Sequence, residues 1–148
     1  MRILVVGMCL LILSCPSWAS ENRETVGIVK AVSGKVFLQL AGEAQSVEAV
    51  ANMKLAAGDS VKTGSDGSAG LIFRDDTVIS LGPNSEFAIE DFQFKPVKRE
   101  LSFVGRMLRG TINYISGQVA KLAPEKVRLE TPDATLGVRG TQILVEIR

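Results

Sequence analysis

The chain has 148 residues, with 17 Lys or Arg, 16 Asp or Glu and no histidine. Its net charge of +1 lacks the strongly basic balance of a nucleic-acid-binding domain, so we expect no nucleic-acid partner. The absence of histidine removes the commonest general base of enzymes and a common zinc ligand, which argues against catalytic and metal-dependent functions.

The first 19 residues predict a secretion signal. Arg2 precedes an apolar run over residues 3–13, which is too short to cross a bilayer. Small side chains at Ser17 and Ala19 occupy the two positions that signal peptidase recognises. We therefore place cleavage between Ala19 and Ser20 and expect the mature protein in the periplasm.

A competing interpretation makes Cys15 the lipidated first residue of a lipoprotein. Leu13 and Pro16 both depart from the usual lipobox pattern, so we favour simple secretion. Cleavage after residue 19 leaves 129 of the 148 residues and removes Cys9 and Cys15, the two cysteines of the chain. The mature chain, residues 20–148, would then be one domain without disulfides and without a transmembrane helix, stabilised by its core.

The mature sequence predicts β structure throughout. Short runs rich in β-branched residues alternate with Gly, Pro, Asp and Asn turns at a spacing of roughly ten residues. This pattern is typical of an all-β single domain of short strands, and it leaves a sandwich, a roll or barrel, and a β-solenoid open. A helix is an alternative only over residues 46–55. The expected strands cover residues 26–32, 35–40, 58–64, 69–74, 77–81, 86–94, 101–105, 111–115, 118–122, 127–130 and 143–145.

The apolar positions of residues 86–94 change phase between Ile89 and Phe92. One extra residue at Glu90 or Asp91 accounts for this change, and a β-bulge there would restore the alternation. We expect the aromatic side chains of the predicted strands to form the core and not a sugar-stacking platform. These side chains are Phe37, Phe73, Phe87, Phe92, Phe94, Phe103 and Tyr114.

The chain contains one short internal repeat. The apolar-Arg-Gly-Thr sequence of residues 108–111 recurs at residues 138–141, an offset of 30 residues. Such a repeat before a strand would suit the same corner in successive coils of a solenoid, although four matched positions in a glycine-rich chain are equally compatible with coincidence.

The carboxylates do not form a catalytic or calcium-binding pattern. Adjacent acids such as Asp75 and Asp76 point to opposite faces of a strand, so they cannot act as an acid–base pair by themselves. The spacing of Asp59, Asp66 and the Asp75–Asp76 pair matches no known calcium loop. We interpret these four acids as solvated turn residues, and we expect neither enzymatic activity nor a cofactor.

Charge is distributed unevenly along the chain. Residues 55–94 are rich in acids, whereas residues 95–128 are rich in bases. Such a split can orient a partner by complementary fields. The uneven distribution is explained equally simply if the strands keep their charged residues on solvent-exposed faces, and we favour that explanation.

The chain closes with a distinctive segment over residues 131–141. Pro132 is followed by two glycines, Gly137 and Gly140, which bracket a Val-Arg pair that ends in Arg139. Glycine on both sides of an arginine indicates a sharp turn or a close approach of another backbone. This segment resembles the closing signature of the FecR-domain family of bacterial envelope proteins. The resemblance extends over residues 26–147 through ordered landmarks at residues 27–29, 33–36, 55–64, 66–69, 71–77, 81–87 and 131–141.

The resemblance implies a function in the cell envelope. The better-known members of the family relay signals between an outer-membrane receptor and a membrane-anchored sigma-factor regulator, by protein–protein contact and without catalytic residues. This chain lacks the N-terminal cytoplasmic segment and transmembrane helix of those members, so we expect a free periplasmic interaction module. Its partner would be an envelope or membrane protein.

The expected partner-binding surface combines the basic segment with the closing signature. Arg139 has a second interpretation as a structural group that bonds nearby carbonyls or an acid. Alternative functions are a structural envelope component that self-associates through residues 142–147, and a module that binds cell-wall glycan; the oligomeric state stays open. The candidate residues are Lys95, Lys98, Arg99, Arg106, Arg109 and Arg139.

Overall fold

The computed structural model describes residues 23–140 and 142–148. The expected signal peptide, its cleavage point between Ala19 and Ser20, and Cys15 lie outside the described residues. Within them the all-β prediction is confirmed, and no described helix has the length and apolarity needed to cross a membrane. The elements are β1 (Gly27–Ser33), β2 (Val36–Gln39), β3 (Ser46–Glu48), β4 (Lys54–Leu55), β5 (Ser60–Thr63), β6 (Ser68–Phe73), β7 (Val78–Leu81), β8 (Glu86–Lys95), η1 (Pro96–Lys98), β9 (Glu100–Ile115), α1 (Gln118–Leu122), η2 (Pro124–Lys126), β10 (Val127–Glu130), β11 (Thr135–Gly137) and β12 (Gln142–Ile147).

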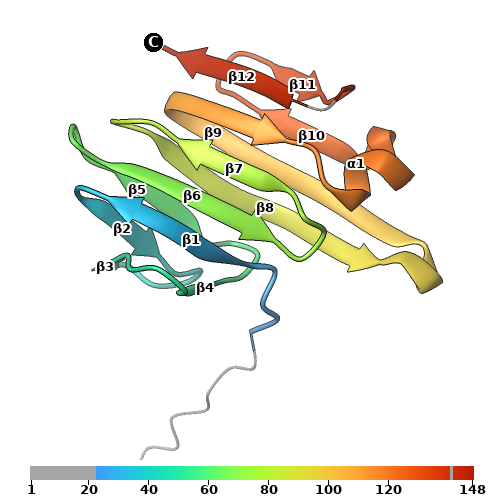
Figure 1. The fold of residues 1–148 in the computed structure, drawn as a ribbon, viewed down its shortest axis with the longest axis horizontal. Coiled ribbons are helices and arrows are strands. Elements are labelled where there is room, and N and C mark those ends of the chain that lie inside the picture. Colours follow the sequence, from blue (N-terminus) through green and yellow to red (C-terminus); the bar gives the residue numbers. More distant parts are fainter. Residues whose placement is uncertain (1–22, 141) are drawn as a thin grey trace, which may run out of the picture.

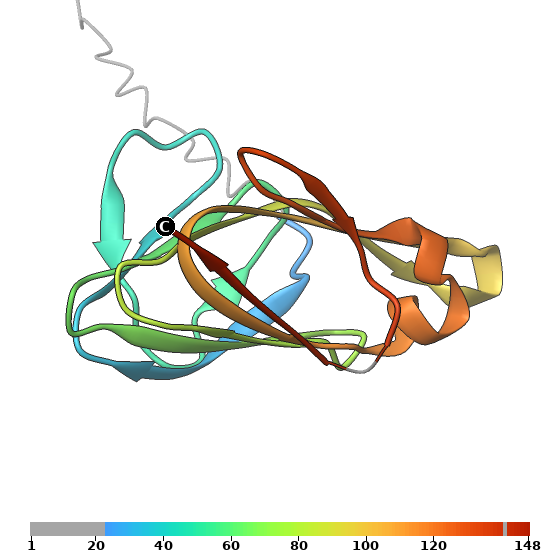
Figure 2. The same cartoon turned by 90° about the horizontal axis from the view of Figure 1, so that it is seen from above.

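The strands form one twelve-stranded sheet that curls back on itself into two layers, and β9 belongs to both (Figures 1 and 2). The first half of β9 pairs with β8 and β10, and its second half pairs with β7 and β12. The first layer therefore runs β3–β2–β5–β8–β9–β10–β11, and the second runs β4–β1–β6–β7–β9–β12. Among the described strands, only β9 and β10 pair in parallel.

The core lies between the two layers and is centred on four aromatic rings. Phe73 of the second layer packs against Phe92 and Phe103 of the first, with ring centroids 5.6 and 5.1 Å apart, and Phe103 also contacts Tyr114 at 5.7 Å. Full burial of each such ring contributes about 1.5–3 kcal/mol. The core prediction is confirmed for these four and for Phe87, which is fully buried.

The core prediction is wrong for Phe37, which is 38 % exposed. Phe37 pairs with Lys62 and Glu48 of the neighbouring strands, so it shares their outer face, and period-two alternation cannot tell which face of a strand is covered. Phe94 is only partly buried, next to the turn of the β8–β9 hairpin.

The bend in β9 has a local cause at Gly110. The β8–β9 register skips Leu108, and Gly110 follows with a φ of +90°. A Cβ at Gly110 would lie 2.3 Å from Oγ of Ser85, which accepts a hydrogen bond from the Thr111 N–H at 3.0 Å. Only glycine fits this corner, where the strand passes from one layer to the other. The bulge expected at Glu90 is also confirmed, since the register shifts between Ile89 and Asp91.

The two copies of the apolar-Arg-Gly-Thr sequence do not occupy the same corner. Gly110 pairs with Ile147, whereas Gly140 lies near the other end of the same strand pair, where its carbonyl accepts a 2.5 Å hydrogen bond from Oγ of Ser116. Because β9 and β12 run antiparallel, the repeat cannot mark successive coils, and its solenoid interpretation is wrong. Antiparallel pairing corresponds to the roll or sandwich alternative instead. Both glycines have positive φ, so the repeat marks two separate changes of direction.

One alternative and one prediction of local structure are wrong. Residues 46–55 are not helical but contain the short strands β3 and β4. Residues 118–122 form α1 instead of a strand, because Asp75 fixes the start of the helix. The backbone carbonyl of Asp75 accepts from the Gln118 N–H at 2.6 Å, and its carboxylate accepts from the Val119 N–H at 3.2 Å.

Two of the four turn acids are buried, which corrects their interpretation as solvated residues. The Asp59 carboxylate accepts hydrogen bonds from the N–H groups of Ala41 and Ala56, both at 2.9 Å, and pairs with Arg23. Asp75 accepts from the N–H and Oγ1 of Thr77 at 3.1 and 2.7 Å, besides its bond to α1. Asp66 and Asp76 are exposed, as expected. Backbone donors replace water around the two buried carboxylates, which ties distant loops to the sheet.

Candidate interaction surface

The most strongly perturbed titratable group lies in the core and not on a surface. Burial raises the pKa of Tyr114 to about 12, and the charge of nearby Asp75 adds to the increase. The Tyr114 hydroxyl is fully buried and has no hydrogen-bond partner within the described part of the chain. This group therefore stays neutral and belongs to the core.

The structure divides the predicted partner-binding residues into two sets. Three of them already have acidic partners. Lys95 pairs with Glu100 at 3.6 Å across the hairpin, and Arg109 pairs with Glu86 at 3.7 Å. Arg106 lies between two glutamates of adjacent strands, Glu90 at 3.4 Å and Glu130 at 3.1 Å.

The other three predicted residues have no internal partner. Lys98, Arg99 and Arg139 make neither an ion pair nor a side-chain hydrogen bond with any described residue. Lys98 and Arg99 lie at the tip of the β8–β9 hairpin, where Arg99 adopts the left-handed conformation and Val97 is 99 % exposed. Arg139 is exposed in the connection between β11 and β12, so the described structure gives its guanidinium no structural bond.

Further free cations lie beside the hairpin tip because β10 pairs with β9 in parallel. Val127 lies opposite Phe103 and Arg128 opposite Val104, which places the start of β10 near the tip. Arg99, Lys126 and Arg128 line one groove there, with a volume of about 420 Å³. The proximity of these bases could not be predicted from the sequence. A turn signals that two strands pair in antiparallel, but no such signal marks the parallel pairing of β9 and β10.

A second groove joins Arg128 to the closing signature. It has a volume of about 860 Å³ and lies along β11, with Arg128 and Arg139 among its lining residues. Val127 and Val138, both almost fully buried, form part of its apolar floor. The hairpin tip and α1 lie at the same end of the molecule (Figures 1 and 2). We call this end, with its two grooves, the basic end. Its cations without described partners are Lys98, Arg99, Lys121, Lys126, Arg128 and Arg139.

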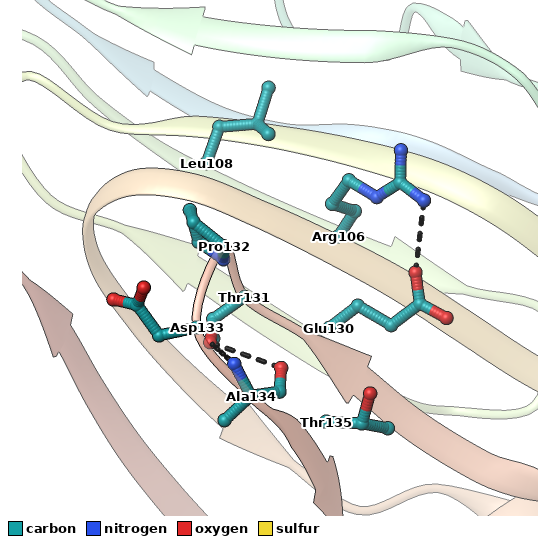
Figure 3. Close-up of a pocket in the computed structure, with 8 residues that line it drawn as sticks. All are labelled: Arg106, Leu108, Glu130, Thr131, Pro132, Asp133, Ala134 and Thr135. Atoms are coloured by element: carbon teal, nitrogen blue, oxygen red, sulfur yellow. Dashed lines mark hydrogen bonds and ion pairs between the residues drawn. The ribbon is translucent and has the colours of Figure 1, made fainter.

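A third hollow, of about 760 Å³, lies between β9 and the β10–β11 turn and is shown in Figure 3. Arg106 and Leu108 project from β9, and Pro132 from the turn faces them. The ion pair from Arg106 to Glu130 crosses one side of the hollow. Arg106, the single cation among the described residues that line this hollow, is therefore already paired. These residues offer an anionic partner no unpaired positive charge.

Comparison with protein families covers the FecR landmarks from residue 59 onward, whereas those at residues 27–29 and 33–36 precede the match. A family model described as FecR protein matches residues 59–148. The chain belongs to the FecR family. No curated protein and no solved structure matches it.

The FecR match covers β5 to β12, and therefore the bent strand, both grooves and the closing signature. Strands β1 to β4 precede the matched region, although β1 and β2 supply the core residues Val29 and Leu38. This FecR-family chain therefore carries its basic end inside the matched region. No cluster of three metal-ligating side chains occurs among the described residues.

Proposed function

We propose that this FecR-family protein is a non-enzymatic periplasmic module that acts in envelope signalling or scaffolding by protein–protein contact. The observation that carries the proposal is the gathering of six cations without described partners at the basic end, beside two grooves. The family supports this direction, since FecR proteins are commonly involved in envelope signalling.

The state of the charges supports a binding role for this end. Exposed cations without partners contribute almost nothing to stability, so the fold does not need them there. A cluster of like charges raises the rate of encounter with a partner of opposite charge and fixes its orientation. The buried carboxylates of Asp59 and Asp75 are, in contrast, occupied by backbone donors, which leaves them unsuited to acid–base chemistry.

Photo-crosslinking in living cells tests the proposal. A photoreactive amino acid replaces Arg99 or Arg139 at the basic end, Arg106 in its ion-paired position, or exposed Lys30 on β1 as the control. We expect one envelope protein to be crosslinked from positions 99 and 139, less from 106, and none from 30. Equal products at all four positions, or none at 99 and 139, would contradict the proposal.

A second candidate function, self-association as a structural envelope component, is favoured by β12. This strand pairs only with β9 among the described strands, and Leu144 on its outer face is 71 % exposed. Light scattering over a range of concentrations tests it. Oligomers that disappear with Leu144→Lys support this function, whereas a monomer at all concentrations rejects it.

A further inference from the structure

We infer that the free edge of β11 binds an extended, acidic segment of a partner protein. The segment would continue the first layer as an added strand, and its carboxylates would bind Arg128 and Arg139. This inference rests on the proposed protein-interaction function and specifies the chemistry of the partner.

The backbone of β11 is available for such pairing. β11 contacts β10 on one side, with Leu136 opposite Leu129 and Gly137 opposite Arg128, and no described strand pairs with its other side. An edge strand presents unpaired N–H and C=O groups, and an extended peptide can satisfy them by strand addition.

Gly137 gives an independent indication that another backbone approaches here. Its φ lies outside the left-handed region, and a Cβ added to it would meet no described atom within 4 Å. Neither conformation nor packing within the described chain therefore requires glycine, although glycine weakens a strand. Glycine in a strand marks a bulge, a tight bend or a position that another backbone approaches closely, and the regular β10–β11 register excludes the bulge. Gly110 differs, because its own corner explains it.

The groove beside β11 sets the side-chain chemistry of the segment. Arg128 and Arg139 provide two positive charges, and Glu125 is the one acid among the residues that line it. The floor is apolar at Val127 and Val138. Side chains of an added strand alternate between two faces, so alternating acidic and apolar residues fit the cations and the floor.

A protein segment fits these features better than a membrane surface or a glycan. The cations line concave grooves and not a flat face, and only a polypeptide can continue a ladder of backbone hydrogen bonds. The edge of β12 lacks this combination, because the strand contains no cation and exposes Glu146, and Arg148, which follows the strand, pairs with that glutamate at 3.4 Å. A charged edge can also serve only to prevent aggregation, and the experiment must separate that role from binding.

The test begins with an unbiased selection. A displayed library of random nine-residue peptides is selected against protein purified from expression of the full chain, and the tightest peptide is synthesised with a fluorophore for anisotropy. We expect enrichment of Asp and Glu at alternating positions. A selection that yields no binder, or binders without acidic enrichment, would overturn the inference.

Variants then locate the site. We expect Arg128→Gln, Arg139→Gln and Gly137→Val each to weaken binding of the peptide at least tenfold, with Lys30→Gln as the matched control within twofold of the wild type. Gly137→Val should retain the melting temperature of the wild type, which separates a blocked edge from a damaged fold. Unchanged binding to Gly137→Val would contradict the close approach of another backbone at position 137.

Backbone hydrogen bonds between the peptide and β11 can be tested separately from the side-chain contacts. N-methylation of alternate peptide residues removes the hydrogen bonds of one strand edge only. One of the two phases should therefore abolish binding while the other retains it, and the amides of Thr135–Gly137 should exchange more slowly in the complex. Equal behaviour of both phases overturns the inference. If positions 99 and 139 still crosslink a protein in cells, the proposed function survives that failure.

Discussion

The acid-rich part of the chain, residues 55–94, and the base-rich part, residues 95–128, differ in where the fold places their charges. In the first part Asp59 and Asp75 are buried, and Glu86 and Glu90 pair with cations of neighbouring strands. In the second part, most of the bases without partners gather at the basic end. A count along the sequence therefore overstates the number of acids that stay free, whereas bases without described partners are concentrated at one end of the molecule.

Removal of a buried acid should have the largest effect. Asp75→Ala would leave the N–H groups of Thr77 and Val119 buried without an acceptor, so we expect a loss of about 3 kcal/mol in the free energy of unfolding. Urea unfolding measures it. Asp66→Ala, in an exposed turn, is the control and should change stability by less than about 0.5 kcal/mol. Similar effects of both substitutions would show that burial of the acid is unimportant.

The free energy of unfolding should also fall at alkaline pH, because Tyr114 is buried in the core near Asp75. The pKa of Tyr114 is about 12 in the folded protein and about 10 in an unfolded chain. Because the folded pKa is the higher one, this contribution is complete below pH 10 and is lost as the pH rises to 12, by about 2 kcal/mol. Urea unfolding at several pH values detects the loss, and Tyr114→Phe should flatten the curve. An unchanged curve in that variant would assign the loss to other groups.

An ion-paired base should have a smaller effect. Arg106→Gln removes two partly exposed ion pairs, with Glu90 and Glu130, and we expect a loss of at most about 1 kcal/mol at low salt. Unfolding at increasing salt concentration should bring the variant and the wild type together. A difference that persists at high salt would indicate that the packing of the Arg106 side chain matters more than its charge.

The smallest effect is expected at the basic end. The double substitution of Arg128 and Arg139 by Gln should leave the free energy of unfolding within about 0.5 kcal/mol of the wild type, because neither side chain has a described partner. Thermal unfolding checks this. A marked loss of stability would reassign both arginines to the fold and remove the basis for a binding role.

Local patterns allowed much of the strand arrangement to be predicted. The phase change between Ile89 and Phe92 located the bulge, because side-chain alternation depends only on neighbours in sequence. The turn of the β8–β9 hairpin, Pro96–Lys98, lies in the gap between the expected strands 86–94 and 101–105. The FecR landmarks were recognised for the same reason, since they are turns and strand starts.

Contacts between residues far apart in the sequence could not be predicted. Asp59 and Asp66 each lie beside a glycine in the sequence, but only the Asp59 carboxylate accepts a hydrogen bond from the backbone of Ala41. The helical form of residues 118–122 depends on Asp75, more than forty residues away. Likewise, the parallel pairing of β10 brings Arg128 to Arg99, and sequence reasoning grouped Arg99 with Arg106 instead.

The sixteen residues of β9 also have a mechanical consequence. Because one continuous strand supplies a member to each layer and both layers enclose one core, opening either layer exposes the apolar face of the other. Unfolding should therefore be cooperative across the whole domain, without a half-folded state in which one layer survives. A force applied at the tip of the β8–β9 hairpin would be transmitted to the β12 edge along the continuous backbone of β9, through the bend at Gly110.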